Sequence, residues 1–446
     1  MTLLASVSEY LEQRIIRRKP SMALRIGVHL PAWFVDAVQQ SRFQAMIRYV
    51  GEHSAFYRRR FQETGIVPSR VKTPDGLDGL FTTSEDLRTH PVEDFLCAPA
   101  QIVFETTGTT SHHNKKVFFG LSEMEWMARY GAAALVHLGV TPQDRLVTAF
   151  DHSFWVSGPL AREVTRVLGC LHVEAGKIEP AEFYDRATHY RFNVLIGEPS
   201  WLMRLSEVAA TRGTWPVKFM LVGGENMTEA TRKYIEGVWN APVYLEYGQT
   251  ESCGAIGVEC PVKDGYHLNE LNFLFEIDSP DKDGYGELVY TTLTRRVMPL
   301  VRYRAADITR WIDTPCPCGL PMRRIAHIRS RKDEMVVCGM GNISPWVFEA
   351  ALEGVSGISS EWQVRVTRPR HKDCLELHLE LVNGERPDAI GERVKHNLRS
   401  LFPDFWKNYE MGLYELEFHG VAPGGLRQGR KLLRLVDARQ GLVDAR

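Results

Sequence analysis

The chain has 446 residues, more than a single hydrophobic core usually serves, so two or three domains are expected. Lys and Arg together number 54 and Asp and Glu 55, a balance that leaves no broad positive field for nucleic acid and no polybasic surface for anionic lipid. No stretch approaches the ~20 apolar residues of a membrane span, and the N-terminal segment lacks the pattern of a secretory signal. Eight cysteines are too few for a disulfide scaffold in so long a chain. We therefore expect a cytoplasmic protein with reduced thiols that binds neither nucleic acid nor membrane.

The predicted secondary structure changes character along the chain. The N-terminal region has helical apolar spacing, clearest at 22–38 and 43–50. From about residue 144, short apolar strands alternate with amphipathic helices, which is typical of βαβ units and a largely parallel sheet. The strands are expected at 145–150, 193–197, 218–223 and 243–247, and the helices at 181–191, 201–212 and 228–239.

Two further changes in composition divide the rest of the chain. Beyond residue 261 the strands become short and glycine-punctuated, as at 287–293, which indicates a small β subdomain, either an antiparallel layer or a small barrel. After 329–333 the pattern is that of a small α+β unit. Its helices are expected at 345–352 and 387–401, and its strands at 375–382 and 415–419. The sequence thus predicts an α/β protein with a large N-terminal domain, residues 1–330, and a small C-terminal domain, residues 331–446.

The first segment that suggests chemistry is a run of hydroxyl residues around a glycine, from Thr106 to Ser111. It follows the apolar stretch 102–104. Backbone N–H groups and hydroxyls in such a loop can surround phosphate oxygens, and Lys115 and Lys116 could add positive charge. Threonine and glycine loops are also common surface turns, so this motif alone leaves both interpretations open.

Two acidic motifs follow apolar stretches of the chain. Tyr247–Glu251 comes directly after a predicted strand, so Glu251 is expected where α/β folds usually bind ligands and could hold Mg²⁺. Tyr303–Asp307 follows the apolar residues 298–301, and Asp307 could accept both hydroxyls of a ribose. An ordinary polar loop and a surface Arg–Asp pair are the respective alternatives.

In this order, the three motifs resemble those of the acyl-adenylate-forming (AMP-binding) enzyme superfamily, and most closely its phenylacetate–CoA ligase-like branch, the aryl-CoA ligases. The resemblance extends over nearly the whole chain, from residues 42–65 to the C-terminal segment 425–431. Two departures from the family pattern fall in the first loop, where Ser111 replaces a glycine and the expected Pro-Lys pair is absent. The resemblance implies a large adenylation domain joined to a small mobile lid domain by a hinge, here at Asp333.

The resemblance also implies which residues bind the nucleotide. Thr250 and Glu251 would act on the phosphates and on Mg²⁺, and Asp307 would bind the ribose. ATP, or the AMP formed from it, would be bound by Thr106, Thr107, Gly108, Thr109, Thr110, Gly224, Glu225, Tyr247, Gly248, Asp307 and Arg331. Lys431 matches the mobile catalytic lysine of the family, although the local spacing also allows Arg430. A positioned cation there would stabilise the charge that builds up during adenylation.

The acyl pocket of the resembling ligases lies behind the turn that corresponds to Gly223 and Gly224. In this chain an aromatic-rich segment containing His152, Phe154 and Trp155 occupies the position of one pocket wall. An apolar pocket with flat rings suits an aromatic acid, and His152 could orient an amino- or hydroxybenzoate. The alternative is that these aromatic residues only pack the core. Phenylacetate, benzoate and anthranilate all remain candidates for the acid.

A second metal site is predicted from Cys260, His267, Cys316 and Cys318, whose spacing is not that of a standard zinc finger. Three thiolates and one imidazole would complete a tetrahedral site with no open position, so the metal would be structural Zn²⁺. Some members of the resembling branch have a similar Cys/His set at this place. Three free cysteines and a surface histidine are the alternative. A hydrolytic zinc site is disfavoured because four protein ligands would close it.

The sequence therefore predicts an ATP-dependent aryl acid–CoA ligase that forms AMP and pyrophosphate. Its expected partners are small molecules, namely an aryl carboxylate, ATP with Mg²⁺, and coenzyme A. One alternative keeps the adenylation step but transfers the acyl group to an acyl carrier protein. Another is a degenerate, non-catalytic nucleotide-binding relative, which the irregular first loop and lysine spacing would favour.

Overall fold

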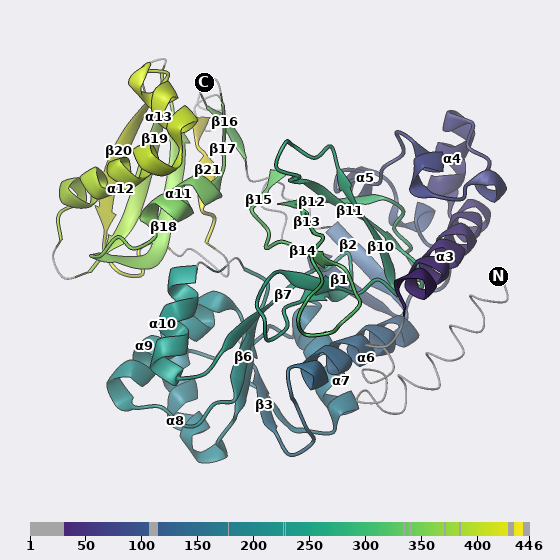
Figure 1. Ribbon diagram of the computed structural model, residues 1–446, viewed down its shortest axis with the longest axis horizontal. Coiled ribbons are helices and arrows are strands. Elements are labelled where there is room, and N and C mark those ends of the chain that lie inside the picture. The colour runs from purple at the N-terminus through teal and green to yellow at the C-terminus, as the bar shows by residue number, and fades with distance from the viewer. Residues whose placement is uncertain are drawn as a thin grey trace. The chain divides into compact units, whose positions relative to one another are not determined.

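The computed structural model describes residues 31–106, 115–176, 178–225, 227, 229–332, 335–338, 341–369, 372–382, 385–426 and 432–439. The chain divides into two compact units (Figure 1). The first comprises Met1–Met227, Arg232–Ala305 and Thr309–His327, and the second comprises Thr228–Thr231, Ala306–Ile308 and Ile328–Arg446. Among the described residues, no helix is both long enough and apolar enough to cross a membrane.

Two helices begin the described part of the first unit, α3 (Ala32–His53) and α4 (Ala55–Thr64), and they meet at Ser54. Ser54 ends α3 in extended backbone and caps α4, because its hydroxyl accepts a hydrogen bond of 3.3 Å from the Tyr57 backbone N–H. The helical spacing predicted before residue 50 therefore corresponds to one helix from residue 32 onward. Short helical turns follow at η1 (Pro68–Arg70), η2 (Pro74–Leu77), α5 (Asp86–Thr89) and η3 (Val92–Asp94).

A nine-stranded sheet with the order β13-β14-β9-β8-β7-β6-β5-β3-β4 forms the centre of the first unit (Figure 1). Its strands are β3 (Arg145–Thr148), β4 (Leu171–Glu174), β5 (Val194–Gly197), β6 (Phe219–Val222), β7 (Val243–Gln249), β8 (Gly254–Val258), β9 (Tyr266–Leu268), β13 (Trp311–Ile312) and β14 (Arg324–Ile325). Neighbours from β4 to β7 are parallel, as predicted. Neighbours from β7 to β13 are antiparallel, so part of the predicted antiparallel layer extends the central sheet.

Helices follow the parallel strands because each parallel crossover needs a long connection. They are α7 (Ser157–Leu168), α8 (Pro180–Tyr190), α9 (Pro199–Arg212) and α10 (Glu229–Trp239), whereas α6 (Leu121–His137) precedes the first parallel strand, β3. The carboxyl ends of β5, β6 and β7 lie at one edge of the sheet, at Gly197, Gly223 and the turn after Gln249. Open α/β sheets bind their ligands at this kind of edge.

Two smaller sheets contain the remaining strands before residue 332. β1 (Ile102–Thr106) pairs with β2 (Lys115–Phe119) in an antiparallel hairpin. A four-stranded sheet has the order β10 (Phe273–Asp278), β11 (Gly286–Thr292), β12 (Tyr303–Thr309) and β15 (Ser330–Arg331). All of β11 is buried, which makes it the centre of this layer. The predicted α/β class with a small β subdomain is confirmed.

The second unit contains one four-stranded sheet and three helices among its described residues from 335 onward. The sheet order is β20 (Tyr414–Val421), β19 (Asp373–Leu381), β18 (Ile358–Thr367) and β21 (Leu435–Asp437). The helices are α11 (Pro345–Leu352), α12 (Pro387–Leu401) and α13 (Pro403–Glu410), and a hairpin is formed by β16 (Val336–Cys338) and β17 (Gly341–Ile343). Phe348, Leu377 and Val394, from two helices and the sheet, are fully buried in one core.

Candidate active site

The strands β1 and β2, which flank the predicted phosphate loop, bring Lys115 to Glu251 in the first unit. β1 ends at Thr106, which is paired in register with Lys115 at the start of β2. The Lys115 ammonium is buried, forms an ion pair with Glu251 Oε1 and donates a hydrogen bond of 2.6 Å to Ser84 Oγ. Thr106, the first residue of the predicted loop, is therefore the strand neighbour of the lysine that pairs with the Glu251 carboxylate. The rest of the predicted loop, which comprises Thr107, Gly108, Thr109, Thr110 and Ser111, lies outside the described residues.

The Glu251 carboxylate is ionised in this setting. Only 4% of the residue is exposed, and burial alone would raise its pKa. The Lys115 ammonium, together with hydrogen bonds that include one of 3.0 Å from the Tyr303 hydroxyl, outweighs burial and holds the pKa of Glu251 below its usual value. Burial and the neighbouring carboxylate raise the pKa of Tyr303, so its phenol remains a donor. An ionised carboxylate of this kind suits a hard cation such as Mg²⁺.

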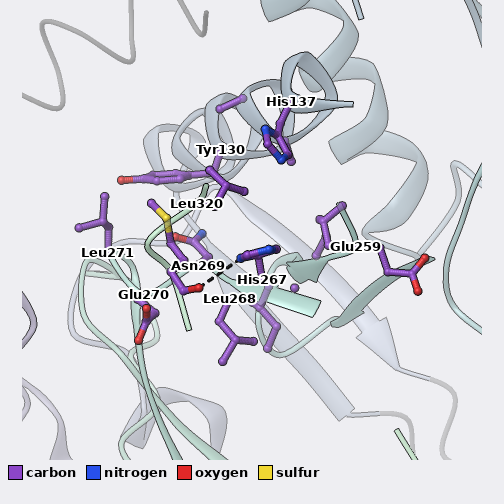
Figure 2. A pocket seen from close by; sticks show the side chains of 17 residues that line it. Tyr130, His137, Glu259, His267, Leu268, Asn269, Glu270, Leu271 and Leu320 are labelled. Carbon is purple, nitrogen blue, oxygen red and sulfur yellow. Dashed lines mark hydrogen bonds between the residues drawn. The ribbon is translucent and has the colours of Figure 1, made fainter. Parts of the chain in front are cut away.

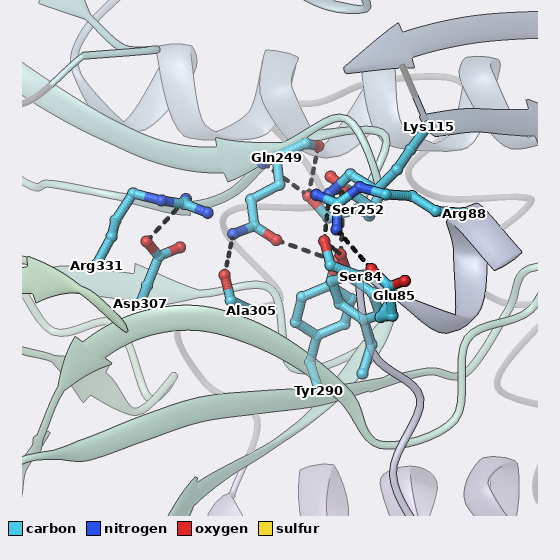
Figure 3. Close-up of polar contacts among 12 residues, drawn as sticks. Ser84, Glu85, Arg88, Lys115, Gln249, Ser252, Tyr290, Ala305, Asp307 and Arg331 are labelled. Atoms are coloured by element: carbon cyan, nitrogen blue, oxygen red, sulfur yellow. Dashed lines mark hydrogen bonds and ion pairs between the residues drawn. The ribbon is translucent and has the colours of Figure 1, made fainter. Parts of the chain in front are cut away.

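A hydrogen bond from Gln249 to β12 constrains the turn that carries Thr250 and Glu251 (Figure 3). Gln249 Nε2 donates a hydrogen bond of 2.9 Å to the Ala305 carbonyl, which ties the end of β7 to β12. At Gly248 a Cβ would lie 2.3 Å from a backbone oxygen across the turn, so only glycine fits. The two predicted residues for phosphate and Mg²⁺ therefore follow β7 at a fixed position.

The glycine turn after β6 lies at the same edge of the sheet. Gly224 has φ 83°, the left-handed conformation that glycine adopts without strain. The Glu225 carboxylate accepts a hydrogen bond of 3.1 Å from the backbone N–H of Ser200, in the first turn of α9. Tyr247 is buried on β7. The roles of these residues in binding the adenine or the acid remain predictions.

Two predicted nucleotide ligands meet in the second unit. Arg331 Nη1 lies 3.0 Å from Asp307 Oδ1, and the two residues are paired in register between β12 and β15 (Figure 3). Asp307 is only 3% exposed, so this is not the surface ion pair that the sequence left open as an alternative. The hinge residue Asp333 and the two candidates for the mobile cation, Arg430 and Lys431, lie outside the described residues. Their roles also remain predictions.

A cavity of about 70 Å³ lies between α6, α7 and the carboxyl ends of the parallel strands. Its apolar lining includes Phe150, Leu160, Val164, Ile196 and Leu221. His152, Phe154 and Trp155, the predicted wall of the acyl pocket, do not line it, and Phe154 is 61% exposed. His152 Nδ1 lies 3.5 Å from a carboxylate oxygen of Glu174 instead. The assignment of these three residues to the acyl pocket remains a prediction.

Sequence reasoning missed Glu246, which lines this cavity, and Lys115 as the partner of Glu251. The available signal for Glu246 was a charged residue inside the otherwise apolar strand 243–247. For Lys115 the sequence showed a lysine near the phosphate loop, but it offered no sign of the partner, which is far away in the chain.

The four predicted zinc ligands converge in the first unit. The ligand atoms of Cys260, His267, Cys316 and Cys318 all lie within 4.8 Å of one another. The Sγ atoms of Cys260 and Cys316 are 3.5 Å apart, and Cys318 Sγ is 3.3 Å from His267 Nε2. Thiolates around a tetrahedral Zn²⁺ are separated by about 3.8 Å, given Zn–S bonds of about 2.3 Å. The donor set and its spacing therefore fit a closed tetrahedral site.

The tautomer and the charge state of His267 suit a metal ligand. Its Nδ1 is 3.1 Å from the Met322 carbonyl oxygen, which places the proton on Nδ1 and leaves Nε2 on the side of Cys318 Sγ. Burial lowers the pKa of His267 to about 4, so the imidazole is neutral at physiological pH. A second cavity, of about 140 Å³, borders this histidine and is also lined by Tyr130 and Asn269 (Figure 2). The two cavities share lining residues on α6 and β8.

Comparison with known proteins identifies relatives of the expected kind, although no protein-family profile matches the chain. Phenylacetate–coenzyme A ligase of Thermus thermophilus is 28% identical over 369 residues, which cover 79% of this chain and 82% of the relative. The enzyme of the same name from Escherichia coli is 25% identical and covers 82% and 88%, respectively. The predicted resemblance to the phenylacetate–CoA ligase-like branch is confirmed, and so is the predicted class of acid–thiol ligase.

Solved structures support the same fold. A 2-hydroxyisobutyryl-CoA ligase in the postadenylation state has a TM-score of 0.79 at 23% identity, covering 92% of this chain and 91% of that one. An o-succinylbenzoate–CoA synthetase from Bacillus subtilis, in complex with ATP and magnesium, has a TM-score of 0.55 at 18% identity, covering 74% and 68%. At these identities the likeness shows the fold, which is that of the adenylate-forming CoA ligases.

Proposed function

We propose that this chain is an ATP-dependent aryl acid–CoA ligase that forms AMP and pyrophosphate. The acid is an aromatic carboxylate of the phenylacetate, benzoate or anthranilate type. The observation that carries the proposal is the position of Glu251, an ionised, buried carboxylate that follows β7 and pairs with Lys115, the strand neighbour of the first residue of the phosphate-loop motif. A site with this arrangement can bring a metal-bound triphosphate to the carboxyl-end edge of the sheet.

In the first half-reaction the acid's carboxylate attacks the α-phosphate of ATP and pyrophosphate leaves. Glu251 would hold Mg²⁺, which offsets the charge of the phosphates. Thr250 and the hydroxyls of the loop that begins at Thr106 bind phosphate oxygens. Lys431, or Arg430 in its place, brings a positive charge to the attacking carboxylate and the α-phosphate.

In the second half-reaction the thiolate of coenzyme A attacks the acyl-adenylate, and AMP leaves. Asp307 holds the ribose hydroxyls through both steps. Rotation at Asp333 withdraws Lys431 and admits the thiol, so one site serves both reactions in turn. The activated anhydride divides one unfavourable condensation into two easier steps.

The Cys260, His267, Cys316 and Cys318 cluster binds structural Zn²⁺ in this proposal. The four protein ligands leave no position for water or substrate, so the metal has no part in either half-reaction. It links the segment after β8 to the segment between β13 and β14, and thereby stabilises the antiparallel half of the central sheet.

The test is ATP–pyrophosphate exchange with a panel of aryl and alkyl acids, with Mg²⁺ and without coenzyme A. We expect exchange with at least one aryl acid, loss of exchange in Glu251→Gln, and thioester and AMP when coenzyme A is added. A matched control is Glu182→Gln, which alters an exposed glutamate on α8. Absence of exchange with every acid, in folded protein that binds ATP, would refute the proposal and favour a nucleotide-binding relative. Transfer to carrier-bound pantetheine but not to coenzyme A would instead identify an acyl carrier protein as the acceptor.

A further inference from the structure

The 70 Å³ cavity has one ionisable group among the described residues that line it, the side chain of Glu246. Glu246 lies on β7, one residue before the Tyr247 that opens the strand-end motif. Its carboxyl group faces the apolar side chains of α7 and the parallel strands. The cavity therefore combines an apolar wall with one strong hydrogen-bond acceptor, which is the usual composition of a selective small-molecule pocket.

Within the described residues, no hydrogen bond or ion pair is made by the Glu246 side chain. Thr165, another polar residue in the lining, bonds to the Ala161 and Arg162 carbonyls and to His172, so it is not turned toward Glu246. Burial raises the pKa of Glu246 to about 7, and no neighbouring cation offsets this effect. Glu246 is partly exposed, and its side chain forms part of the cavity wall.

The carboxyl group also lies directly against the glycine turn. A Cβ at Gly223 would be 2.5 Å from Glu246 Cγ and 2.6 Å from its Oε1. The absence of a side chain at position 223 therefore makes room for this carboxyl group. Gly223 belongs to the turn behind which the resembling ligases have their acyl pocket, so the acceptor and the acid would meet at this point.

An unpaired carboxyl group in an apolar wall is costly to the folded protein, because the surrounding apolar side chains supply none of the hydrogen bonds that its oxygens can accept. A ligand that carries a donor restores those bonds. We infer that Glu246 is a specificity-determining residue that binds a hydrogen-bond donor, an amino or hydroxyl group, on the acyl part of the acid. The inference rests on the proposed function and narrows its substrate class to amino- or hydroxy-substituted acids.

The recognition is expected to be strong. A site built around a buried acceptor discriminates sharply against an analogue that lacks the donor, because the analogue leaves the acceptor unpaired.

The experiment is pyrophosphate exchange with matched acid pairs on the full chain. The pairs are benzoate with its 2-, 3- and 4-amino and hydroxy derivatives, phenylacetate with the same set, and isobutyrate with 2-hydroxyisobutyrate. In the wild-type protein we expect one donor-bearing acid to exceed its parent by about 10- to 100-fold in kcat/KM. In Glu246→Leu this preference is expected to fall below about threefold, while exchange with the parent acid rises. Glu246→Gln retains part of the preference, and the exposed Glu182→Gln retains all of it.

Stability provides a second measurement. Replacing an unpaired, partly buried carboxyl group with leucine is expected to leave the thermal midpoint at neutral pH unchanged or higher. A lower midpoint would show that Glu246 has a structural partner and would overturn the inference. Exchange that is equal for parent and donor-bearing acids, or a preference that survives Glu246→Leu, would also overturn it while leaving the ligase proposal intact. Absence of exchange with every acid would overturn both.

Discussion

The buried ion pair between Lys115 and Glu251 offers the sharpest test of the site. Lys115→Met keeps the length and much of the volume of the side chain but removes the cation that pairs with a carboxylate that is 4% exposed. Breaking a buried pair in this way costs about 3–5 kcal/mol of unfolding free energy, because the remaining charge is uncompensated. The hydrogen bond from the Tyr303 hydroxyl to Glu251 remains in the variant, so we expect the loss of unfolding free energy to lie near the lower end of this range.

The effect has a defined pH dependence. The folded-state pKa of Glu251 lies below the ordinary value of 4.5, so its pairing stabilises the protein above that value and the stabilisation is lost as the pH falls through the folded-state pKa. The difference between wild-type protein and Lys115→Met should therefore be largest at neutral pH and narrow below about pH 4.5. Mg²⁺ should partly restore the variant, because a cation bound at Glu251 replaces the missing charge.

The assay is thermal unfolding from pH 7.5 to pH 4, with and without Mg²⁺. Lys116→Met is the matched control, since the next residue of β2 is exposed. We expect a fall of at least about 5 °C in the midpoint for Lys115→Met at pH 7.5 and little change for Lys116→Met. Equal shifts for the two variants, or a Lys115→Met shift that does not depend on pH, would refute the reasoning.

Three further predictions concern the cavity and the metal cluster. Between pH 4.5 and about 7, the unfolding free energy should fall as the pH rises, by at most ~3 kcal/mol. The reason is that Glu246 holds a proton in the folded protein that it has lost in the unfolded chain. In pH-dependent denaturation, Glu246→Leu should remove this decrease in the unfolding free energy. Gly223→Ala should lower the thermal midpoint because its methyl group would clash with the Glu246 side chain. The same substitution should lower the midpoint less in a protein that already carries Glu246→Ala. If the two effects are simply additive in the double variant, the contact between positions 223 and 246 is excluded. Metal analysis should find one zinc per chain, and Cys316→Ser, unlike Cys170→Ser, should abolish it and lower the midpoint; purified protein without zinc would exclude the site.

Much of the fold could be predicted from local sequence pattern. The helices α11 and α12 begin and end where they were predicted, since each has a proline at its first turn and a continuous helical pattern after it. The parallel strands were recognisable as short apolar runs because both faces of such a sheet are covered. The antiparallel strands β8 and β9 were harder to place, because short strands do not reveal which sheet they extend.

The residues of the candidate site also fall into two groups, those that the sequence could identify and those that only the folded structure could identify. Thr250, Glu251 and Asp307 could be proposed from their motifs, and the four zinc ligands from their chemistry. Lys115 and Glu246 could not, since the first depends on a contact between residues 136 positions apart and the second on a cavity formed by two helices and several strands.

The motifs, the strand and helix order and the ligase class follow from the sequence, because each depends on residues that are near one another in the chain or on resemblance to known motifs. The charge state of Glu251, the environment of Glu246 and the convergence of the Cys/His cluster required the folded structure. Burial and Coulomb interactions depend on distances in space, and the chain order of a residue does not reveal which distant groups surround it.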